Sequence, residues 1–530
     1  MQDTNRMSGT FRVVIAIAIS LGIFFRFFHL DHKVYWFDEV YSTTRIAGYS
    51  IEDVRQSLFQ NQIIPAPTLQ TYQQPKPDST LVDTIDVLIQ EDAKHPPLYY
   101  GVANLWMRQV GHSITASRAL PALISVITLP LMFALGLELF SSYMVAYLAT
   151  VLIALSPFDI LFAQTVRQYS LLTAFILASS WLLLRAMRLR RWRDWGWYTL
   201  ACFLGLYTHL FFGLTLLGQG MYVVSQHISR LTNPESFHRK SPILLPYLLS
   251  TVGTIALYVP WIVALLTGGD RTFQSSGWTH SSADFVYLLK FWILSFSSLF
   301  FDLDMGFDHP ITYLLRLPFI VLVLVALWQL WSHSSGVASR FIWTSIFIPF
   351  LALALPDLIF GGRRSAITRY LICSFPGIQL AVAYLLGKYL LKRRIWQGIW
   401  AVMLTASITS CVVSAYSPTW WSKGVSYANA KTAAVLNRLD APLLISDLGQ
   451  NYLNQGNLIS LSYRLDADVK LLPIDKDAIA TGLAAVQLHE NKNVLLYQPS
   501  ADLRRQAEAK WGPLPLIDPP ETGLWRISEQ

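Results

Sequence analysis

The sequence predicts a polytopic α-helical membrane protein with about eleven transmembrane helices, interfacial helices in its outer loops and a small C-terminal α/β domain outside the membrane. Of its 530 residues, 53% are hydrophobic and only 14% are charged, against roughly 25% charged residues in soluble domains. The mean hydropathy is +0.39. The net charge of +8 does not indicate a nucleic-acid partner, because the basic residues form short clusters between apolar runs, as is typical of membrane topology.

The apolar runs have the length of membrane crossings. The first, at 11–30, is interrupted by Arg26, and no small-residue cleavage site follows it. We therefore expect an uncleaved anchor helix rather than a signal peptide. The pair at 195–210 and 211–228 is the weakest, because each run is short. The ten runs after the first lie at 118–139, 142–161, 169–189, 195–210, 211–228, 243–266, 312–331, 341–360, 368–390 and 397–416.

Lysine and arginine in short loops predict the orientation, because they favour the cytoplasmic side. They gather in three turns, at 185–193, 230–240 and 388–394. With these turns in the cytoplasm, the N-terminus is also cytoplasmic, and the protein is expected in the inner or plasma membrane. The segments then expected outside are 31–117, 268–311, 361–368 and 417–530.

Two further apolar segments, 95–106 and 284–301, are not expected to cross. Counting either as a span would move a basic turn to the outer side, so we expect helices lying along the outer interface. Residues 61–80, in the first outer loop, are rich in proline and polar residues, and we expect them to be flexible.

The chain changes character after residue 416, which divides a membrane domain at 1–416 from a domain at 417–530. Short apolar runs at 442–447, 468–474 and 493–498 predict strands. Residues 501–512 predict a helix. The sequence therefore predicts an extracytoplasmic α/β domain, and it shows no internal repeat.

Two adjacent carboxylates, Asp38 and Glu39, follow the first apolar run. A carboxylate at the outer end of a span could act as a base and take a proton from an acceptor hydroxyl. Alternatively, Asp38 could be the N-cap of a helix through 40–48, with Glu39 in its first turn. The residues leave both roles open, and the two are compatible.

Several cationic and aromatic side chains are expected on the same outer face, against the usual cytoplasmic excess of positive charge. They stand in "KHPPLYY", "AQTVRQYSLL", "YTHLF" and "GGRRSAITRYLICSFPG". Guanidinium groups bind phosphates or carboxylates well, whereas helix capping and contact with lipid headgroups are the structural alternatives. The candidates are Lys94, His95, Arg118, Arg167, Tyr169, His209, Arg363, Arg364 and Arg369.

No motif points to a soluble nucleotide or a cofactor. The sequence has neither a G-x-x-x-x-G-K-[ST] loop nor a G-x-G-x-x-G fingerprint. Cys202, Cys373 and Cys411 lie in apolar runs and indicate neither disulfides nor a thiolate site. We expect no metal site, although the sequence leaves open a divalent cation held by Asp38 and Glu39.

Taken together, these motifs resemble the C-type (GT-C) membrane glycosyltransferases. The resemblance rests on the Asp-Glu pair, "HPPLYY", "SRALPALISVITLPLMFALGLELF" and "ALSPFDILFAQTVRQYSLL", in this order between 11 and 185, and on the later "RRSAITRYLICSFPG". The chain looks most similar to protein O-mannosyltransferases, to the aminoarabinose transferase of lipid A (ArnT-like), and to RgtA/B/C/D-like transferases of the lipopolysaccharide core.

The resemblance implies a GT-C fold and the transfer of a sugar, with inversion, from an undecaprenyl or dolichyl phosphate to a hydroxyl of a glycan, lipid or protein on the outer face. It implies that Asp38 is the general base and that Glu39 positions the acceptor or its neighbours. His95 would lie beside the lipid phosphate. Because the chain reads "RQY" where some relatives have an acidic residue, a metal-independent mechanism is expected. The residues implied to neutralise the leaving phosphate are Arg118, Arg167 and Arg369.

Two other classes of function make different predictions. A transporter or lipid flippase would show repeated halves and spans broken near the midplane. A non-catalytic scaffold for envelope assembly would have no cavity joining Asp38 to the arginines. The candidate residues lie in outer loops, which favours the transferase.

Overall fold

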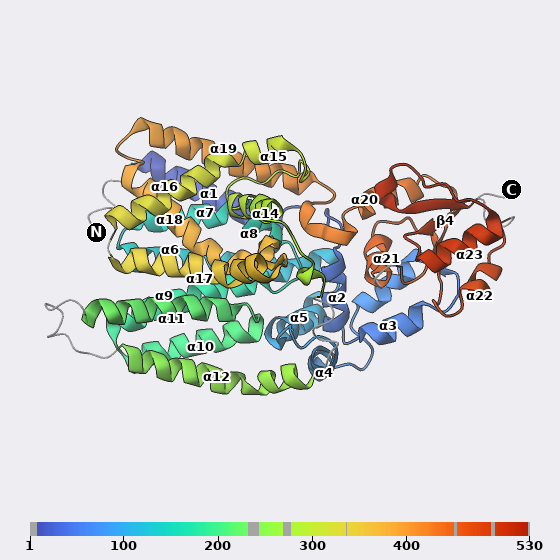
Figure 1. The fold of residues 1–530 in the computed structure, drawn as a ribbon, viewed down its shortest axis with the longest axis horizontal. Helices are drawn as coiled ribbons and strands as arrows, with labels where there is room; N and C mark the ends of the chain where they lie inside the picture. The colour runs from blue at the N-terminus through green and yellow to red at the C-terminus, as the bar shows by residue number, and fades with distance from the viewer. Residues whose placement is uncertain are drawn as a thin grey trace. The chain divides into compact units, whose positions relative to one another are not determined.

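The structure is a computed structural model that describes residues 8–231, 243–268, 277–334, 336–449, 453–488 and 493–527. Its contacts divide the chain into two units (Figure 1). The membrane unit comprises Met1–Phe28, Leu88–Tyr99 and Arg118–Ala415. The α/β unit comprises His29–Val87, Tyr100–Ser117 and Tyr416–Gln530.

The membrane unit is a bundle of helices that lie side by side (Figure 1). In the described residues, eight helical segments are long and apolar enough to cross a bilayer, and the bent pair α7–α8 makes a ninth. The predicted polytopic helical fold is thereby confirmed. The eight are α1 (Gly9–Phe27), α6 (Ile114–Phe140), α9 (Tyr169–Leu189), α12 (Leu244–Thr267), α15–α16 (Pro310–Leu314, Leu317–His333), α17 (Gly336–Phe360), η6–α18 (Thr368–Ser374, Phe375–Tyr389) and α19 (Arg394–Tyr416).

The two remaining predicted spans form α10 (Trp192–Thr208) and α11 (Phe212–Leu231). Neither belongs to the segments that satisfy the length and apolarity of a crossing. They nevertheless pack within the bundle, α10 against α9 and α12, and α11 against α17. The predicted interfacial helix at 284–301 is α14 (Phe285–Ser297), whose 13 residues are too few to cross a bilayer.

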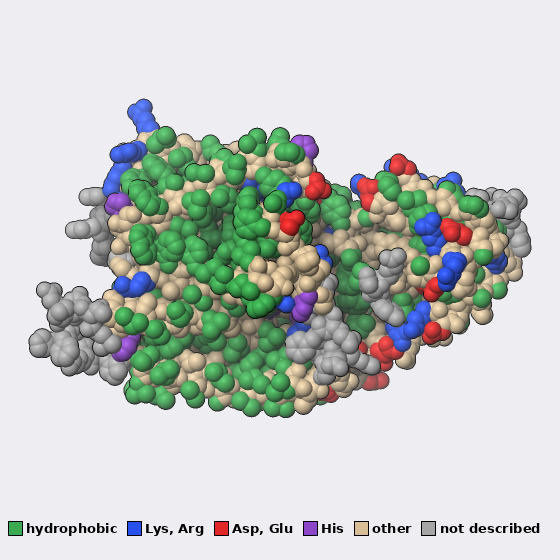
Figure 2. All heavy atoms as spheres, viewed as in Figure 1, with side chains coloured by type: hydrophobic (Ala, Val, Ile, Leu, Met, Phe, Trp, Pro, Cys, Tyr) green, Lys and Arg blue, Asp and Glu red, His purple; other side chains and the backbone are tan. Residues whose placement is uncertain are grey.

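The outward face of the membrane unit is apolar, as Figure 2 shows for one side of the bundle. On α12, the side chains of Leu248, Val252, Ile255, Val259 and Val263 are 47–63% exposed. Their spacing of three or four residues places them in one stripe along the helix. Such a stripe is unfavourable against water but stable against lipid tails, so its position supports a membrane environment.

Arg26 explains how the bundle tolerates a broken span. Helices α7 (Tyr143–Ala154) and α8 (Pro157–Ala163) meet at 55°, and the last carbonyls of a helix have no intrahelical partner. Arg26 of α1 is fully buried and donates hydrogen bonds to the carbonyls of Ile153 (2.9 Å) and Ala154 (2.5 Å). The arginine that interrupts the first apolar run therefore satisfies the end of another helix.

Replacing Arg26 with Met should destabilise the protein by about 3 kcal/mol, because two buried carbonyls lose their donor in an apolar interior. The measurement is the free energy of unfolding, or the Tm, of the purified protein in detergent. The control is Arg12→Met, since Arg12 is exposed on the same helix. Equal stability of the two variants would contradict the capping role of Arg26.

The α/β unit contains one five-stranded sheet in the order β1-β3-β2-β4-β5. The strands are β1 (Ile64–Pro65), β2 (Leu443–Ser446), β3 (Lys470–Pro473), β4 (Val494–Tyr497) and β5 (Leu524–Ile527). Strand β2 is parallel to β3 and β4, and the edge strands β1 and β5 are antiparallel to their neighbours. The three predicted strands and the predicted helix, α23 (Ala501–Trp511), are confirmed.

The predicted flexibility of residues 61–80 is wrong. This segment forms β1 and the 3-10 helix η2 (Ala66–Gln73), and β1 adds an edge strand to β3. Proline is tolerated in such an edge strand because it has no backbone N–H group that would need a hydrogen-bond partner. The amide of Gln73 donates to the Thr44 hydroxyl at 2.8 Å, so polar composition here reflects hydrogen bonding rather than solvation.

The α/β unit contains further short helices. They are α2 (Phe37–Ile46), α3 (Ile51–Leu58), η7 (Trp421–Ser426), α20 (Asn429–Leu436), α21 (Asn454–Ser462), α22 (Ile479–Ala484) and η9 (Pro520–Thr522). Helices α4 (Leu81–Glu91) and α5 (Pro97–Val110) contribute residues to both units. The buried core includes Leu443, Ile445, Leu472, Leu496 and Leu503.

Candidate active site

The Asp-Glu pair lies in the first turn of α2. The helix begins earlier than expected, with Trp36 as its N-cap, so the prediction that Asp38 is the N-cap is wrong. The capping contact comes from Glu39, whose Oε2 accepts the Trp36 backbone N–H at 3.0 Å. Asp38 is half-buried, whereas Glu39 is fully buried. Of the two carboxylates, Asp38 is therefore the more accessible.

Glu39 also forms a buried ion pair. Its Oε2 lies 3.1 Å from Nζ of Lys423, and the two side chains are 0% and 1% exposed. A buried carboxylate requires such a partner because its desolvation is otherwise very costly. This contact assigns Glu39 a structural role; its predicted effect on the acceptor stays a prediction.

His95 and Arg167 contact each other in the membrane unit. Nη2 of Arg167 lies 2.9 Å from Nε2 of His95, and Nδ1 of His95 lies 3.0 Å from the carboxylate of Asp92. Because a guanidinium can only donate, Nε2 must be the acceptor and Nδ1 must carry the proton that faces Asp92. Asp92 therefore lies on one side of the imidazole and the Arg167 guanidinium on the other.

His209 is a buried imidazole close to Tyr169, whose ring also contacts Arg167. It lies in the turn between α10 and α11. Burial, followed by the electrostatic influence of His95, Arg167 and Arg369, holds the pKa of His209 well below its usual value. The ring of Tyr169 lies between these groups, with its centroid 6.0 Å from the imidazole of His209 and 5.9 Å from the Arg167 guanidinium carbon.

The segment that carries Arg369 is held by Asp357, at the end of α17. Its carboxylate accepts the Ser365 backbone N–H at 2.6 Å and lies 3.9 Å from the Arg364 guanidinium. Gly362 has φ +133°, and a Cβ there would lie 2.7 Å from Asp357 Oδ1. The turn therefore requires glycine at this position.

The structure thus brings four of the predicted cationic or aromatic residues near His209. They are His95, Arg167, Tyr169 and Arg369, and together with His209 we call them the cationic cluster. Arg118 is fully buried near the start of α6, and its predicted place at the phosphate stays a prediction. The Lys94 ammonium lies 3.6 Å from Asp92. Arg363 donates its backbone N–H to the Thr279 carbonyl at 3.0 Å.

Comparison with known proteins identifies the fold. Residues 94–263 match the model of the dolichyl-phosphate-mannose-protein mannosyltransferase family. The crystal structure of ArnT from Cupriavidus metallidurans bound to undecaprenyl phosphate is similar over 98% of this chain and 99% of that chain, with 13% identity and a TM-score of 0.52. This chain has the fold of the C-type membrane glycosyltransferases.

A weaker similarity is to the archaeal oligosaccharyltransferase AglB from Archaeoglobus fulgidus in complex with an inhibitory peptide and a dolichol-phosphate. It is 10% identical, with 92% of this chain and 70% of that chain covered and a TM-score of 0.47. A search of the curated proteins finds no match.

Three residues of this C-type fold were missed by the sequence reasoning: Asp92, Asp357 and Lys423. Asp92 could have been found, because it precedes His95 by three residues, just before the predicted interfacial segment 95–106. Asp357 lies within an apolar span, where an acidic residue is itself a functional signal. Lys423 carries no local signal, since its partner Glu39 is 384 positions away.

Metal ligands do not gather in the described residues, which contain no group of three or more His, Cys, Asp or Glu side chains able to hold a metal ion. We predicted from the sequence that the protein needs neither a metal ion nor another cofactor, and this stays a prediction. The cysteines within the described chain, Cys202, Cys373 and Cys411, are buried and are not joined in disulfides.

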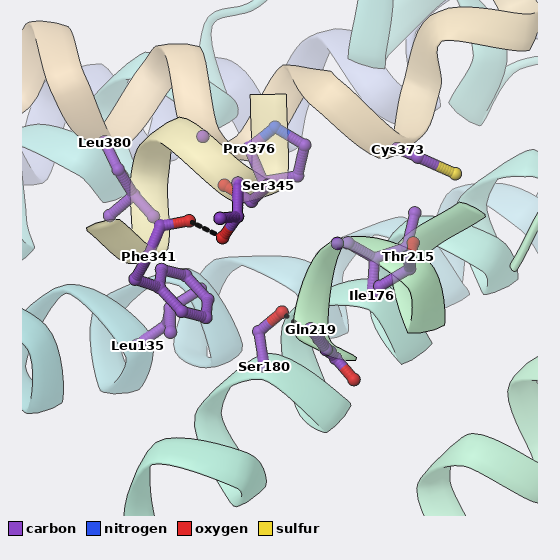
Figure 3. Close-up of a pocket in the computed structure, with 13 residues that line it drawn as sticks. Leu135, Ile176, Ser180, Thr215, Gln219, Phe341, Ser345, Cys373, Pro376 and Leu380 are labelled. Carbon is purple, nitrogen blue, oxygen red and sulfur yellow. Dashed lines mark hydrogen bonds between the residues drawn. The ribbon is translucent and has the colours of Figure 1, made fainter. Parts of the chain in front are cut away.

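A separate cavity lies between α9, α11, α17 and α18 (Figure 3). Gln219, one of its lining side chains, is hydrogen-bonded to neighbouring helices. The Gln219 amide donates to the hydroxyls of Ser179 (3.0 Å) and Ser180 (3.3 Å) and accepts from Tyr198 (2.9 Å). Hydrogen bonds of this kind join helices within membranes, and we assign this cavity a structural role.

Replacing Gly362 with Ala should destabilise the protein by about 2 kcal/mol, because an L-residue is strained at this φ and its Cβ would collide with Asp357. Thermal unfolding in detergent measures the change. The matched control is Gly398→Ala in α19, where a Cβ meets nothing within 4 Å. If Gly362→Ala is as stable as this control, the turn is not constrained in the way described.

Proposed function

We propose that this protein is a membrane glycosyltransferase that moves a sugar from a polyprenyl phosphate to an acceptor hydroxyl on the outer face, with inversion of the anomeric carbon. The observation that carries the proposal is the cationic cluster. Nη2 of Arg167 lies 2.9 Å from Nε2 of His95, and the Tyr169 ring lies 5.9 Å from the Arg167 guanidinium carbon and 6.0 Å from the His209 ring. Burial, followed by the influence of His95, Arg167 and Arg369, keeps the pKa of His209 low, in a chain with the C-type fold. A phosphate group would offset this positive charge.

In the proposed reaction, the carboxylate of Asp38 accepts the proton of the acceptor hydroxyl. The hydroxyl oxygen forms a bond to the anomeric carbon on the face opposite the phosphate. The bond between this carbon and the phosphate oxygen breaks, and its electron pair leaves with the polyprenyl phosphate. Arg167 and Arg369 stabilise the charge that develops on the phosphate.

Asp92 and His95 serve this step by orienting Arg167. A guanidinium that is held at one N–H by a fixed acceptor presents its plane in one direction, which matters for bidentate phosphate binding. The similar structure of ArnT contains undecaprenyl phosphate, which supports a donor of this class. We also propose that the reaction needs no metal ion and that the N-terminus is cytoplasmic.

A transporter is the main alternative, and the feature that would favour it is the break between α7 and α8. Transporters bind ions or substrates at the free backbone groups of such breaks. Here the carbonyls of Ile153 and Ala154 accept hydrogen bonds from Arg26. The break is therefore filled by the chain itself, which supports the transferase instead.

Asp38→Asn should lower transfer by at least about a thousandfold while the protein still folds, because the amide cannot accept the proton. The assay follows release of undecaprenyl phosphate from a panel of synthetic undecaprenyl-phosphate monosaccharides, with membrane lipids or water as the acceptor. Thermal unfolding verifies folding. Turnover by Asp38→Asn at the normal rate would refute the assignment of the base.

Arg369→Ala and Arg167→Ala should each weaken the binding of undecaprenyl phosphate by about tenfold or more, because each removes a charge-assisted hydrogen-bond donor. Binding is measured with the purified protein in nanodiscs. The control is Lys392→Ala, an exposed residue of the basic turn at 388–394, for which we expect unchanged binding. Unchanged affinity in an arginine variant would remove that residue from the phosphate site.

A further inference from the structure

Helix α2, which carries Asp38, is held at its first turn by the C-terminal part of the α/β unit. The first contact is the ion pair between Lys423 of η7 and Glu39 at 3.1 Å. The Glu39 oxygen that binds Lys423 also accepts the Trp36 backbone N–H. One carboxylate oxygen therefore joins η7 to the N-terminus of the helix, next to Asp38.

The second contact comes from Ser426, the last residue of η7. The backbone N–H of Phe37, the first residue of α2, donates to the Ser426 hydroxyl at 3.0 Å. An N–H in the first turn of a helix has no partner within the helix, so Ser426 supplies the acceptor that a side-chain N-cap would usually provide. Trp36 cannot provide one, because its indole only donates.

Behind Ser426, a buried polar network continues to the sheet. The Ser426 hydroxyl donates to the Asn457 side-chain oxygen at 3.0 Å, and the Asn457 amide donates to the Tyr497 hydroxyl at 2.6 Å. Tyr497, in β4, donates in turn to Asn429 at 2.9 Å. These side chains are 0% exposed. Fully satisfied buried networks hold their members in one arrangement.

Helix α21 adds a close backbone contact. A Cβ on Gly456 would lie 3.0 Å from the ring of Phe37 and 3.2 Å from that of Tyr41. The absence of a side chain at Gly456 lets both rings of α2 rest on the backbone of α21. The first turn of α2, which carries Asp38, is thus held by an ion pair, a hydrogen bond and packing, and all three contacts come from residues beyond 416.

We propose that Lys423 and Ser426 are positioning residues that set the place of the Asp38 carboxylate, so that the C-terminal domain is a working part of the transferase site. This inference rests on the proposed function. Lys423 acts through Glu39 rather than on the substrate, because its ammonium is buried against that carboxylate. Removing it leaves a buried negative charge beside Asp38, and the helix start must move to hydrate that charge.

The direct test measures amide hydrogen exchange over residues 37–46 in the full-length purified protein. In Lys423→Met, exchange in the first turn of α2 should be about tenfold faster, because local opening becomes easier. The control is Lys431→Met, which breaks the exposed ion pair between Lys431 and Glu521 of the same unit. Exchange in this control should match the unmodified protein.

The catalytic test compares kcat and KM for the undecaprenyl-phosphate sugar of the panel that gives turnover. In Lys423→Met, kcat should fall by about tenfold while the KM of the donor stays within about twofold, because the loss is confined to the chemical step. The double variant Glu39→Gln/Lys423→Met removes both charges, and the introduced glutamine can still accept the Trp36 N–H. It should recover kcat and slow exchange to within about threefold of the unmodified protein.

Three results would overturn the inference: unchanged exchange over 37–46 in Lys423→Met, faster exchange with an unchanged kcat per folded molecule, or a double variant no more active than Lys423→Met. The last would mean that the charges themselves take part in the reaction. If Lys423→Met does not fold, Ser426→Ala decides by the same measurements, with an expected change of about threefold in exchange and kcat.

The two proposals fail in different ways. Full turnover by Asp38→Asn would reject the proposed base while the exchange measurement still tests the anchoring of α2. An inactive Asp38→Asn together with a fully active Lys423→Met would reject only the positioning role.

Discussion

A charge placed in an apolar interior must be paired or hydrogen-bonded, and this constraint shapes both units of the protein. Arg26 is fully buried and binds the carbonyls at the end of α7. Arg316 and Asp302, each 3% exposed, form an ion pair at 2.8 Å. Glu39 and Lys423 do the same in the α/β unit. In each case the charge joins segments that are separated in the chain.

The cationic cluster places several basic side chains close together. His95, Arg167, Arg369 and His209 lie near one another, and burial, followed by the influence of the other three residues, holds the pKa of His209 low. Like charges are gathered at some cost in stability, and such sites are often functional. Asp92 neutralises part of the charge through His95 and at the same time orients Arg167. The arrangement suits a group that carries negative charge, as the phosphate of a lipid-linked donor does.

Each unit holds its own candidate residues by internal contacts. In the membrane unit, the turn after α17 and the Asp92–His95 pair hold the segments that carry the cationic candidates. The α/β unit joins the loop that carries Asp38 and β1 to residues beyond 416, with which β1 forms one sheet. The C-terminal region is therefore more than an appended domain, because it completes the structure of the loop that carries Asp38.

The sequence by itself determined the features that depend on local patterns. Apolar length predicted the spans, short apolar runs predicted β2, β3 and β4, and the motifs predicted the C-type fold. It also made His95, Arg167 and Arg369 candidates, because arginine and histidine on the face predicted to lie outside need an explanation; their role at a phosphate stays a prediction. The weakest predicted pair became α10 and α11, where apolar length was marginal.

Only the tertiary structure decided the features that depend on distant partners. Nothing near Glu39 indicates Lys423, 384 positions away, and nothing in the proline-rich loop indicates that β1 would pair with β3. Likewise, Arg26 is explained only by the end of α7. The physical reason is the same in each case: a buried polar group needs a partner, but its own sequence neighbourhood does not specify which one the fold provides.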